Sequence, residues 1–406
     1  MVFLKRPAFA LLFCAVLASG SATAQRRGEY ALRAAATLDS LYACYSVPGT
    51  KLLRENYPDD ASYKATYLAG ESAGNPFSYL WPFSGTLSAV VALVETVGWE
   101  AYGPLLDTVV LPGLREYADD RRRPFAYASY IASAPVSDRF YDDNIWLGID
   151  FTDLYAATRQ QRFLFTDFYL GTKDPAHLDK ARMIWEFIES GTDDKLGGGI
   201  YWCEQKKESK NTCSNAPGAV FALKLYLATG REHYLEQGRA LYEWTRRKLL
   251  DSSDNLYFDH ISLKGPLNKT KYSYNSGQMI QAGALLYRIT GRKRYLSEAQ
   301  ATAAACLTHF FRPVRKPGGG SVRILRRDKI WFDAVMLRGF IELYREDGRD
   351  VGLNAFRETL DHAWSHARDT RGLLADWSGR GREGRKWLLS QAALAEMLAR
   401  MASVAE

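Results

Sequence analysis

Two neighbouring carboxylates are the side chains of this sequence best placed to do chemistry. Asp142 and Asp143 follow Tyr141, and a strongly apolar helical pattern runs on from Leu147. The pair therefore stands at the N-terminus of a predicted buried helix. If the first aspartate has a non-helical backbone there, both side chains can flank one bond. Two close carboxylates repel, so one keeps its proton, while the helix dipole favours the other as an anion. An acid beside a carboxylate nucleophile, about 5–5.5 Å apart, is the pairing that cleaves glycosidic bonds with retention.

Aromatic and polar residues near the ends of long loops are expected to line a sugar site around this pair. Flat rings suit the apolar C–H face of a sugar, and amides and carboxylates suit its hydroxyl groups. Any single tryptophan among them also fits core packing. The predicted substrate-binding residues are Trp81, Tyr141, Asn144, Trp202, Asp259, Tyr274, Asn275 and Gln278.

An internal repeat indicates the architecture that positions these residues. Leu-Tyr, Thr-Gly and Tyr-Leu recur in order at 225–235 and at 286–296, and weaker copies carry Gly171 and Gly348. Each unit is long enough for two helices and two connections. The glycine after each tyrosine helix is predicted to be a left-handed C-cap.

The connections between the predicted helices alternate between short turns and long loops. The long loops end near Trp81, Asp142, Cys213, Tyr274, Trp331 and Trp387. Six helical hairpins closed in a ring form an all-α (α/α)6 barrel of about twelve helices, with every long loop at one end. An open α-solenoid also fits the repeat, but the repeat number and the loop asymmetry favour the closed barrel. We expect one catalytic domain over residues 25–406.

Other kinds of site lack their sequence patterns. Of the six histidines only His362 and His366 share a helix face, and no further ligand spacing completes a zinc site. There is neither a Gly-x-Ser-x-Gly elbow nor a phosphate-binding loop. The net charge of +7 comes from scattered basic residues without a nucleic-acid-binding motif. We therefore expect no metal, no cofactor and no nucleic-acid partner.

The N-terminal residues predict export. Lys5 and Arg6 precede an apolar run from Ala8 to Leu17, and small residues end at Ala24. This is the layout of a signal peptide, residues 1–24, cleaved after Ala24. The run is shorter than the roughly 20 residues of a spanning helix, so we expect no membrane span. The mature protein is expected to be secreted or periplasmic.

Four cysteines follow Ala24, and an oxidising compartment permits disulfides. Cys203 and Cys213 lie close together in a loop-like segment and form a candidate disulfide. Cys44 and Cys306 fall inside helical patterns, which is typical of buried thiols. Four cysteines allow three pairings, and the sequence does not choose among them.

Five short motifs carry a family resemblance. They are Tyr-Leu-Trp-Pro-Phe-Ser from Tyr79, Phe-Tyr-Asp-Asp-Asn-Ile-Trp from Phe140, Gly-Gly-Gly-Ile-Tyr-Trp from Gly197, Cys-Ser-Asn-Ala-Pro from Cys213, and Tyr-Ser-Tyr-Asn-Ser-Gly-Gln from Tyr272. In type and order they resemble glycoside hydrolase family 76, the endo-α-1,6-mannanases, well over residues 79–296 and more weakly beyond.

The resemblance implies an (α/α)6 barrel without a metal, and retention of the anomeric configuration. It implies that Asp142 is the nucleophile, that Asp143 is the acid/base and that Asp259 contacts sugar. Leu147 departs from the family pattern, since many members carry a tryptophan there. That difference puts one subsite in doubt and leaves the carboxylate pair intact.

The predicted function is retaining cleavage of α-1,6-mannosidic linkages in a mannan backbone by double displacement, and three alternatives stay open. Related fungal cell-wall proteins are transglycosidases, so the chain could transfer mannan instead of hydrolysing it. A non-catalytic α-mannan-binding protein would keep the aromatic residues without needing both acids. A sugar epimerase or uronyl hydrolase of the same barrel would need a catalytic histidine or a basic pocket, and His260 beside Asp259 is the one candidate near the loop ends.

Overall fold

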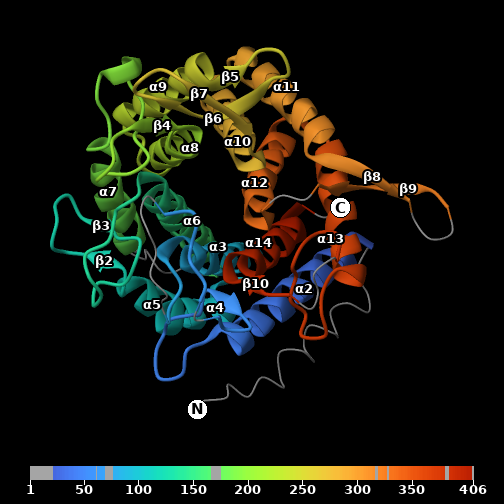
Figure 1. The fold of residues 1–406 in the computed structure, drawn as a ribbon. Coiled ribbons are helices and arrows are strands. Elements are labelled where there is room, and N and C mark those ends of the chain that lie inside the picture. The colour runs from blue at the N-terminus through green and yellow to red at the C-terminus, as the bar shows by residue number, and fades with distance from the viewer. Residues whose placement is uncertain are drawn as a thin grey trace.

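A closed ring of six parallel helices forms the inner wall of the protein (Figure 1). The computed structural model describes residues 22–60, 62–68, 76–165, 175–315, 319–326, 329–379 and 384–404. The inner helices are α3 (Leu80–Thr96), α6 (Tyr141–Phe165), α8 (Thr212–Thr229), α10 (Ser273–Thr290), α12 (Ile330–Asp347) and α14 (Leu388–Val404). Each contacts the next in chain order, and α14 contacts α3, so the ring closes. The predicted (α/α)6 barrel is confirmed.

A second layer of helices surrounds the ring. It consists of α2 (Ala22–Tyr45), α7 (Pro175–Glu189), α9 (Glu232–Leu249), α11 (Lys293–His309), α13 (Val351–His366), and one broken helix made of α4 (Trp99–Leu105), a π-helical turn (Leu106–Val110) and α5 (Leu111–Arg115). The break lies between Pro104 and Pro112, each of which lacks an N–H for the helical ladder. Helix α2 packs on α14, so the first and last helices described complete one hairpin of the barrel.

The burial of side chains separates the two layers. Helix α8 is buried continuously from Thr212 to Leu223, as expected for a helix with neighbours on every face. Helix α9 instead buries a stripe that includes Tyr234, Leu241 and Tyr242, and leaves its opposite face to solvent. Burying one large apolar side chain contributes about 1.5–3 kcal/mol. The apolar layer between the two rings of helices therefore holds the barrel together.

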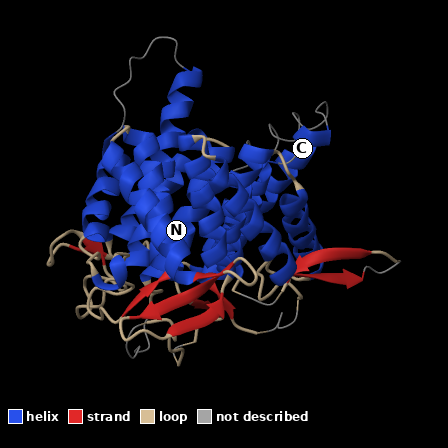
Figure 2. Ribbon diagram, turned by 90° about the horizontal axis from the view of Figure 1, so that it is seen from above, coloured by secondary structure: helices blue, strands red, loops and turns tan. Residues whose placement is uncertain are grey.

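Short antiparallel strands gather at one end of the helical body (Figure 2). They are β1 (Asn56–Tyr57), β2 (Ala118–Asp119), β3 (Ala126–Tyr127), β4 (Ser209–Asn211), β5 (Leu250–Asp251), β6 (Leu256–Ser262), β7 (Leu267–Lys271), β8 (Phe311–Arg315), β9 (Ser321–Leu325) and β10 (Lys386–Trp387). Strand β6 pairs with β4, β5 and β7, and the other pairs are β1–β10, β2–β3 and β8–β9. These strands belong to the long connections that lead into the inner helices, so the long loops share one end, as predicted.

Glycines end three inner helices. Gly230, Gly291 and Gly348 directly follow α8, α10 and α12 with φ of 69°, 66° and 67°. Each donates its N–H to the carbonyl of the repeat tyrosine four residues earlier. The predicted left-handed C-caps are confirmed at these positions. The copy with Gly171 lies outside the described residues.

The predicted signal peptide also falls almost wholly outside the described residues, which begin at Ala22 within α2. Within the described ranges, no helix combines the length and apolarity that a membrane span requires.

Helices α10 and α12 meet at a pair of glycines. A Cβ built on Gly339 would lie 2.1 Å from the carbonyl oxygen of Gly277, and a Cβ on Gly277 would lie 2.4 Å from Met336 Cα. Both contacts are with backbone, which cannot swing aside as a side chain can. The absence of side chains at these two positions therefore sets the separation of the helices.

We predict that Gly339→Ala lowers the free energy of unfolding by about 3 kcal/mol, because the two backbones must separate. Gly348→Ala is the matched control at the end of the same helix. Its Cβ would meet open space, so only the left-handed backbone is strained, at a cost of about 1 kcal/mol. Urea denaturation of both variants measures the difference, and equal losses would contradict the close-approach explanation.

Candidate active site

Two backbone contacts determine where α6 begins, and with it the position of the two acids. Phe140 forms an antiparallel bridge with Cys203. The backbone N–H of Tyr141 donates to the carbonyl of Trp202 at 2.9 Å. The loop that precedes α8 thus holds the residues just before Asp142, although it lies some sixty positions later in the chain.

A buried arginine fixes the same place from the other side. Arg139 is 1% exposed, and its Nε donates to Glu204 at 2.7 Å. Its Nη1 donates to the carbonyl of Pro124 at 2.9 Å. A charge-assisted pair with this geometry orders both loops, so the first turn of α6 has a defined position at the barrel mouth.

Asp142 is partly buried among groups that favour its anion. Burial raises its pKa to about 7. The thiol of Cys213, the backbone N–H groups of Asp142 and Asp143, and the side chain of Trp202 oppose that rise. Donors at a helix N-terminus stabilise negative charge, so Asp142 is the acid of this pair that ionises more readily.

Asp143 is the more deeply buried of the two acids, at 9% exposed. Burial raises its pKa well above the usual range, and the negative charge of Asp142 raises it further. Among the described residues, no cation contributes an opposing effect on its pKa. Asp143 therefore retains its proton when Asp142 is ionised.

The other Asp-Asp pairs of the chain have a different electrostatic setting. At least one aspartate of each forms an ion pair with a basic residue, which favours the carboxylate. These ion pairs are Asp60–Arg385, Asp119–Arg122 and Asp193–Lys210. The setting of Asp142–Asp143 is consequently the one suited to an acid and a carboxylate acting together.

Aromatic rings from the starts of the other inner helices meet at the barrel mouth. The ring centroids of Trp81 lie 5.2 Å from Trp387 and 5.3 Å from Trp331. Tyr274 stacks on Phe332 at 4.0 Å and lies 6.1 Å from Trp331. Of the predicted substrate-binding residues, Trp81 and Tyr274 thus share one aromatic cluster, built from α3, α10, α12 and the strand before α14.

A second group of predicted residues surrounds Asp142. Burial is the largest cause of the raised pKa values of Cys213 and Tyr274, and the charges of Asp142 and Asp259 both add to it. Asp259 lies on β6 and its Oδ2 is 2.9 Å from Nδ1 of His260. The structure therefore places Asp259, Tyr274 and Asp142 around the thiol of Cys213.

Two of the predicted sugar contacts have side chains that are buried in the core, and their roles stay predictions. Tyr141 is fully buried and stacks on Phe187 at 4.6 Å. Gln278 is fully buried one turn into α10, and its Nε2 donates to Gln281 at 2.8 Å. Asn275 is buried too, but both polar atoms of its amide have no partner among the described residues, so its role stays a prediction.

The amide of Asn144, a further predicted sugar contact, holds a loop in the structure. Its Oδ1 accepts the N–H of Tyr127 at 2.8 Å. Its Nδ2 donates to the carbonyls of Tyr127 at 3.0 Å and Phe140 at 2.8 Å. The side chain thus pairs with the backbone of β3 as a neighbouring strand would.

Asn215 repeats this arrangement at the same position of α8. Its Oδ1 accepts the N–H of Ile200 at 2.6 Å. Its Nδ2 donates to the carbonyls of Ile200 at 2.9 Å and Asn211 at 2.8 Å. Both asparagines are the fourth residue of an inner helix, and both bind a residue of the preceding loop and the carbonyl four positions back. The same bonds at two equivalent positions indicate that Asn144 has a structural role.

The predicted disulfide between Cys203 and Cys213 is wrong. Both cysteines are buried free thiols, as is Cys306, and Cys44 is a partly buried free thiol. Cys203 is held in its bridge to Phe140, whereas Cys213 starts α8 beside Asp142. The charge of Asp142 acts on both thiols, and neither forms a disulfide.

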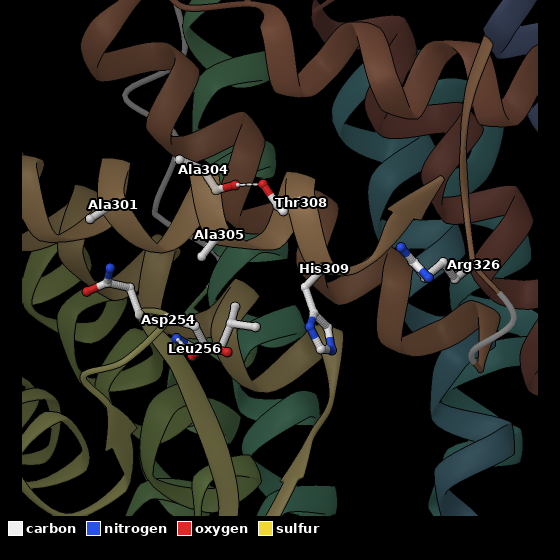
Figure 3. A pocket seen from close by; sticks show the side chains of 9 residues that line it. Asp254, Leu256, Ala301, Ala304, Ala305, Thr308, His309 and Arg326 are labelled. Atoms are coloured by element: carbon white, nitrogen blue, oxygen red, sulfur yellow. Dashed lines mark hydrogen bonds between the residues drawn. The ribbon is translucent and has the colours of Figure 1, made fainter. Parts of the chain in front are cut away.

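A groove elsewhere on the barrel contains none of these residues (Figure 3). It has a volume of about 720 Å³ and lies between the outer helix α11 and the turn after β5. Three alanines of α11 line it together with Asp254, His309 and Arg326. Among the described residues, no group of three or more His, Cys, Asp and Glu side chains is arranged to hold a metal ion.

The buried acid makes a prediction about stability. The folded pKa of Asp143 is above the unfolded value of about 3.9, so the folded protein holds a proton that the unfolded chain releases. Its contribution to stability therefore falls as the pH rises above about 4. Asn carries no charge at any pH, so Asp143→Asn should raise the free energy of unfolding by about 1–3 kcal/mol at pH 8 and by little at pH 4.

Urea denaturation at the two pH values measures this difference. Asp60→Asn is the matched control, since hydrogen bonds from Ser62 lower the pKa of this exposed aspartate and no gain is expected. If Asp143→Asn is less stable than the parent at pH 8, the carboxyl is stabilised by a partner in the folded protein and the explanation is wrong.

The amide arrangement makes a second prediction. Asn144→Ala and Asn215→Ala each remove three hydrogen bonds to buried backbone groups, so each should lower the free energy of unfolding by about 2–4 kcal/mol. Asn354→Ala, at a partly exposed amide on α13 that bonds Asp350, should cost less than about 1 kcal/mol. Thermal unfolding followed by circular dichroism compares the three variants. Similar losses of stability would contradict the structural role of the Asn144 and Asn215 amides.

Comparison with known proteins agrees with the architecture. Bt3792, a glycoside hydrolase family 76 mannosidase from Bacteroides thetaiotaomicron VPI-5482, is 32% identical with a TM-score of 0.81, over 93% of this chain and 98% of that chain. The GH76A α-1,6-mannanase of Salegentibacter sp. HEL1_6 has the same fold at 23% identity, with a TM-score of 0.68 over 93% of this chain and 100% of that chain.

The curated relatives match over a shorter stretch. Mannan endo-1,6-alpha-mannosidase DCW1 of Saccharomyces cerevisiae is 31% identical over 130 residues, which is 29% of this chain and 28% of that protein. The match covers less than a third of the length of each curated relative. The family model for glycosyl hydrolase family 76, in contrast, matches residues 54–405. On this match, the chain belongs to glycosyl hydrolase family 76.

Proposed function

We propose that this protein is a retaining glycoside hydrolase that cleaves α-1,6-mannosidic linkages in a mannan backbone. The asymmetry of the acid pair carries the proposal. Asp142 has donors that favour its anion, as a nucleophile requires, and Asp143 is buried beside that charge and keeps its proton, as a general acid requires. The names of the matched relatives, a mannosidase and an endo-1,6-alpha-mannosidase, support the substrate.

The first step of the proposed reaction forms a covalent intermediate. A carboxylate oxygen of Asp142 bonds to the anomeric carbon of a mannosyl unit while the bond from that carbon to O6 of the next unit breaks. Asp143 donates its proton to the departing oxygen, which leaves as a hydroxyl group. Asp142 is now an ester and Asp143 a carboxylate.

The second step restores both acids. Asp143 takes a proton from water as the water oxygen bonds to the anomeric carbon, and the ester bond to Asp142 breaks. Two inversions give net retention. The charge of Asp142 is one cause of the raised pKa of Asp143. Esterification removes that charge, so the pKa of Asp143 falls when its role changes from acid to base.

We predict that Asp142→Asn and Asp143→Asn each lower turnover of linear α-1,6-mannan by at least about a thousandfold, because each removes one half of the pair. Reducing-end assays measure the rate. With an aryl mannoside whose leaving group needs no protonation, azide should restore turnover to Asp143→Asn and give the α-mannosyl azide, because azide attacks the ester of Asp142 without a general base. Azide that reacts in Asp142→Asn replaces the nucleophile, so it gives the β-mannosyl azide.

Two further readouts complete this experiment. Proton NMR of the first product should show the α-anomer, and a first product with the β-anomer would exclude double displacement. Sizing the products separates hydrolysis from transfer, since transfer yields chains longer than the substrate. Full activity in either variant would remove that residue from the proposed mechanism.

A further inference from the structure

A buried glutamate joins three parts of the barrel mouth on the side of Asp143. Glu55 is 6% exposed. Its Oε1 accepts hydrogen bonds from the hydroxyl of Tyr67 at 2.7 Å and from Nε1 of Trp387 at 2.6 Å. Its Oε2 accepts the backbone N–H of Tyr79 at 3.0 Å. Burial raises the pKa of Glu55, and these three donors oppose that rise.

The side chains that Glu55 holds form an aromatic surface. The ring centroid of Tyr67 lies 5.0 Å from Trp81 and 5.6 Å from Trp387. Those two indoles lie 5.2 Å apart, nearly perpendicular. All three rings are partly exposed. We call Tyr67, Trp81 and Trp387, with Glu55 behind them, the Glu55 wall.

The wall crosses the seam where the two ends of the barrel meet. Asn56 of β1 pairs with Trp387 of β10, and the backbone N–H of Leu388 donates to the carbonyl of Glu55 at 2.9 Å. The segment after α2 thus supplies Glu55 and Tyr67, and the segment before α14 supplies Trp387. Glu55 thus holds two rings across this seam, Tyr67 and Trp387, and Trp81 packs against both of them.

The two acids face different neighbours. The charge of Asp143 contributes to the raised pKa of Tyr67, after burial and Glu55. The charge of Asp142 contributes instead at Cys213 and Tyr274. Helix α6 lies between α3 and α8 in the ring. The Glu55 wall contains Trp81 at the start of α3, so it lies on the α3 side of α6, where the charge of Asp143 acts on Tyr67.

We propose that the Glu55 wall binds the mannosyl unit that departs in the first step, and that Glu55 is a positioning residue for this subsite. The proposal rests on the proposed function. A general acid must reach the oxygen of the leaving group, so the departing sugar lies on the side of Asp143. Exposed aromatic rings present the apolar surface that the C–H face of that sugar requires.

The test compares two substrates that differ in what leaves. Linear α-1,6-mannan places a mannosyl unit against the wall, whereas dinitrophenyl α-1,6-mannotrioside releases a phenolate and leaves that subsite without a sugar. Glu55→Gln loses the charge that orders three donors, and Trp387→Phe keeps a ring and loses its N–H. We expect each variant to lower kcat/KM on mannan about tenfold, and on the aryl substrate by less than about twofold.

Trp202→Phe is the matched control. Trp202 lies beside Asp142, so the same kind of change there should lower kcat/KM on both substrates equally. Inhibition by added α-1,6-mannobiose, which would occupy the leaving-group subsite, should weaken about tenfold in Glu55→Gln and Trp387→Phe. If circular dichroism shows that Glu55→Gln does not fold, Trp387→Phe alone tests the proposal, since it alters one hydrogen bond.

The outcomes separate this proposal from the proposed function. Equal losses on both substrates, or no loss on mannan, in folded Glu55→Gln and Trp387→Phe would overturn the assignment of the wall and leave the mechanism standing. A parent enzyme that cleaves neither substrate would overturn the proposed function, and the leaving-group subsite with it.

Discussion

Two carboxyl groups on adjacent residues, buried together at a helix N-terminus, are the constraint on which the rest of the structure depends. Each carboxyl loses hydration, and each is disfavoured as an anion by the other. In the part of the chain that the structure describes, no cation offsets these two effects on the pKa of Asp143. A pair in this setting is unstable as two anions and is well suited to share one proton, so the scaffold must supply the stability that the site does not.

The barrel supplies that stability through repetition. Six inner helices are buried over most of their length between neighbours and an outer layer. Because they run parallel, their N-termini and all long loops share one end, where backbone N–H groups favour negative charge. The acid pair therefore lies at the end of the barrel that has hydrogen-bond donors, and the apolar side chains lie along the helices.

Buried amides connect the loops to this frame. Gln391, the fourth residue of α14, accepts the N–H of Leu374 and donates to its carbonyl, both at 2.8 Å, and donates to the carbonyl of Trp387 at 3.1 Å. Asn144 and Asn215 make the same three bonds at the same position of α6 and α8. A loop held in this way behaves as if it were paired in a sheet, which gives the acid pair and the aromatic cluster defined positions without long strands.

Much of this could be predicted from the residues themselves. All six inner helices begin within one residue of the predicted loop ends. Repeat spacing and glycine caps are local properties, written in consecutive residues, so they can be read without knowing what packs on what. The location of Asp142 and Asp143 at a buried helix start follows from the same local pattern. Their unequal environments do not, because Cys213 and Trp202 come from a later loop.

Side-chain direction is what only the tertiary structure decided. Tyr141, Asn144 and Gln278 have residue types that suit sugar binding, yet all three are buried. Tyr141 and Gln278 pack in the core, and Asn144 bonds the loop before α6. The proximity of Cys203 and Cys213 in the chain pointed to a bridge, but both are free thiols in the structure. Glu55 and Tyr67 lie outside every repeat, and only closure of the ring brings them to Trp387. The sequence by itself thus determined the helices, their caps and the acid pair, all of which are local, whereas the walls of the site depend on contacts between distant segments that form only when the ring closes.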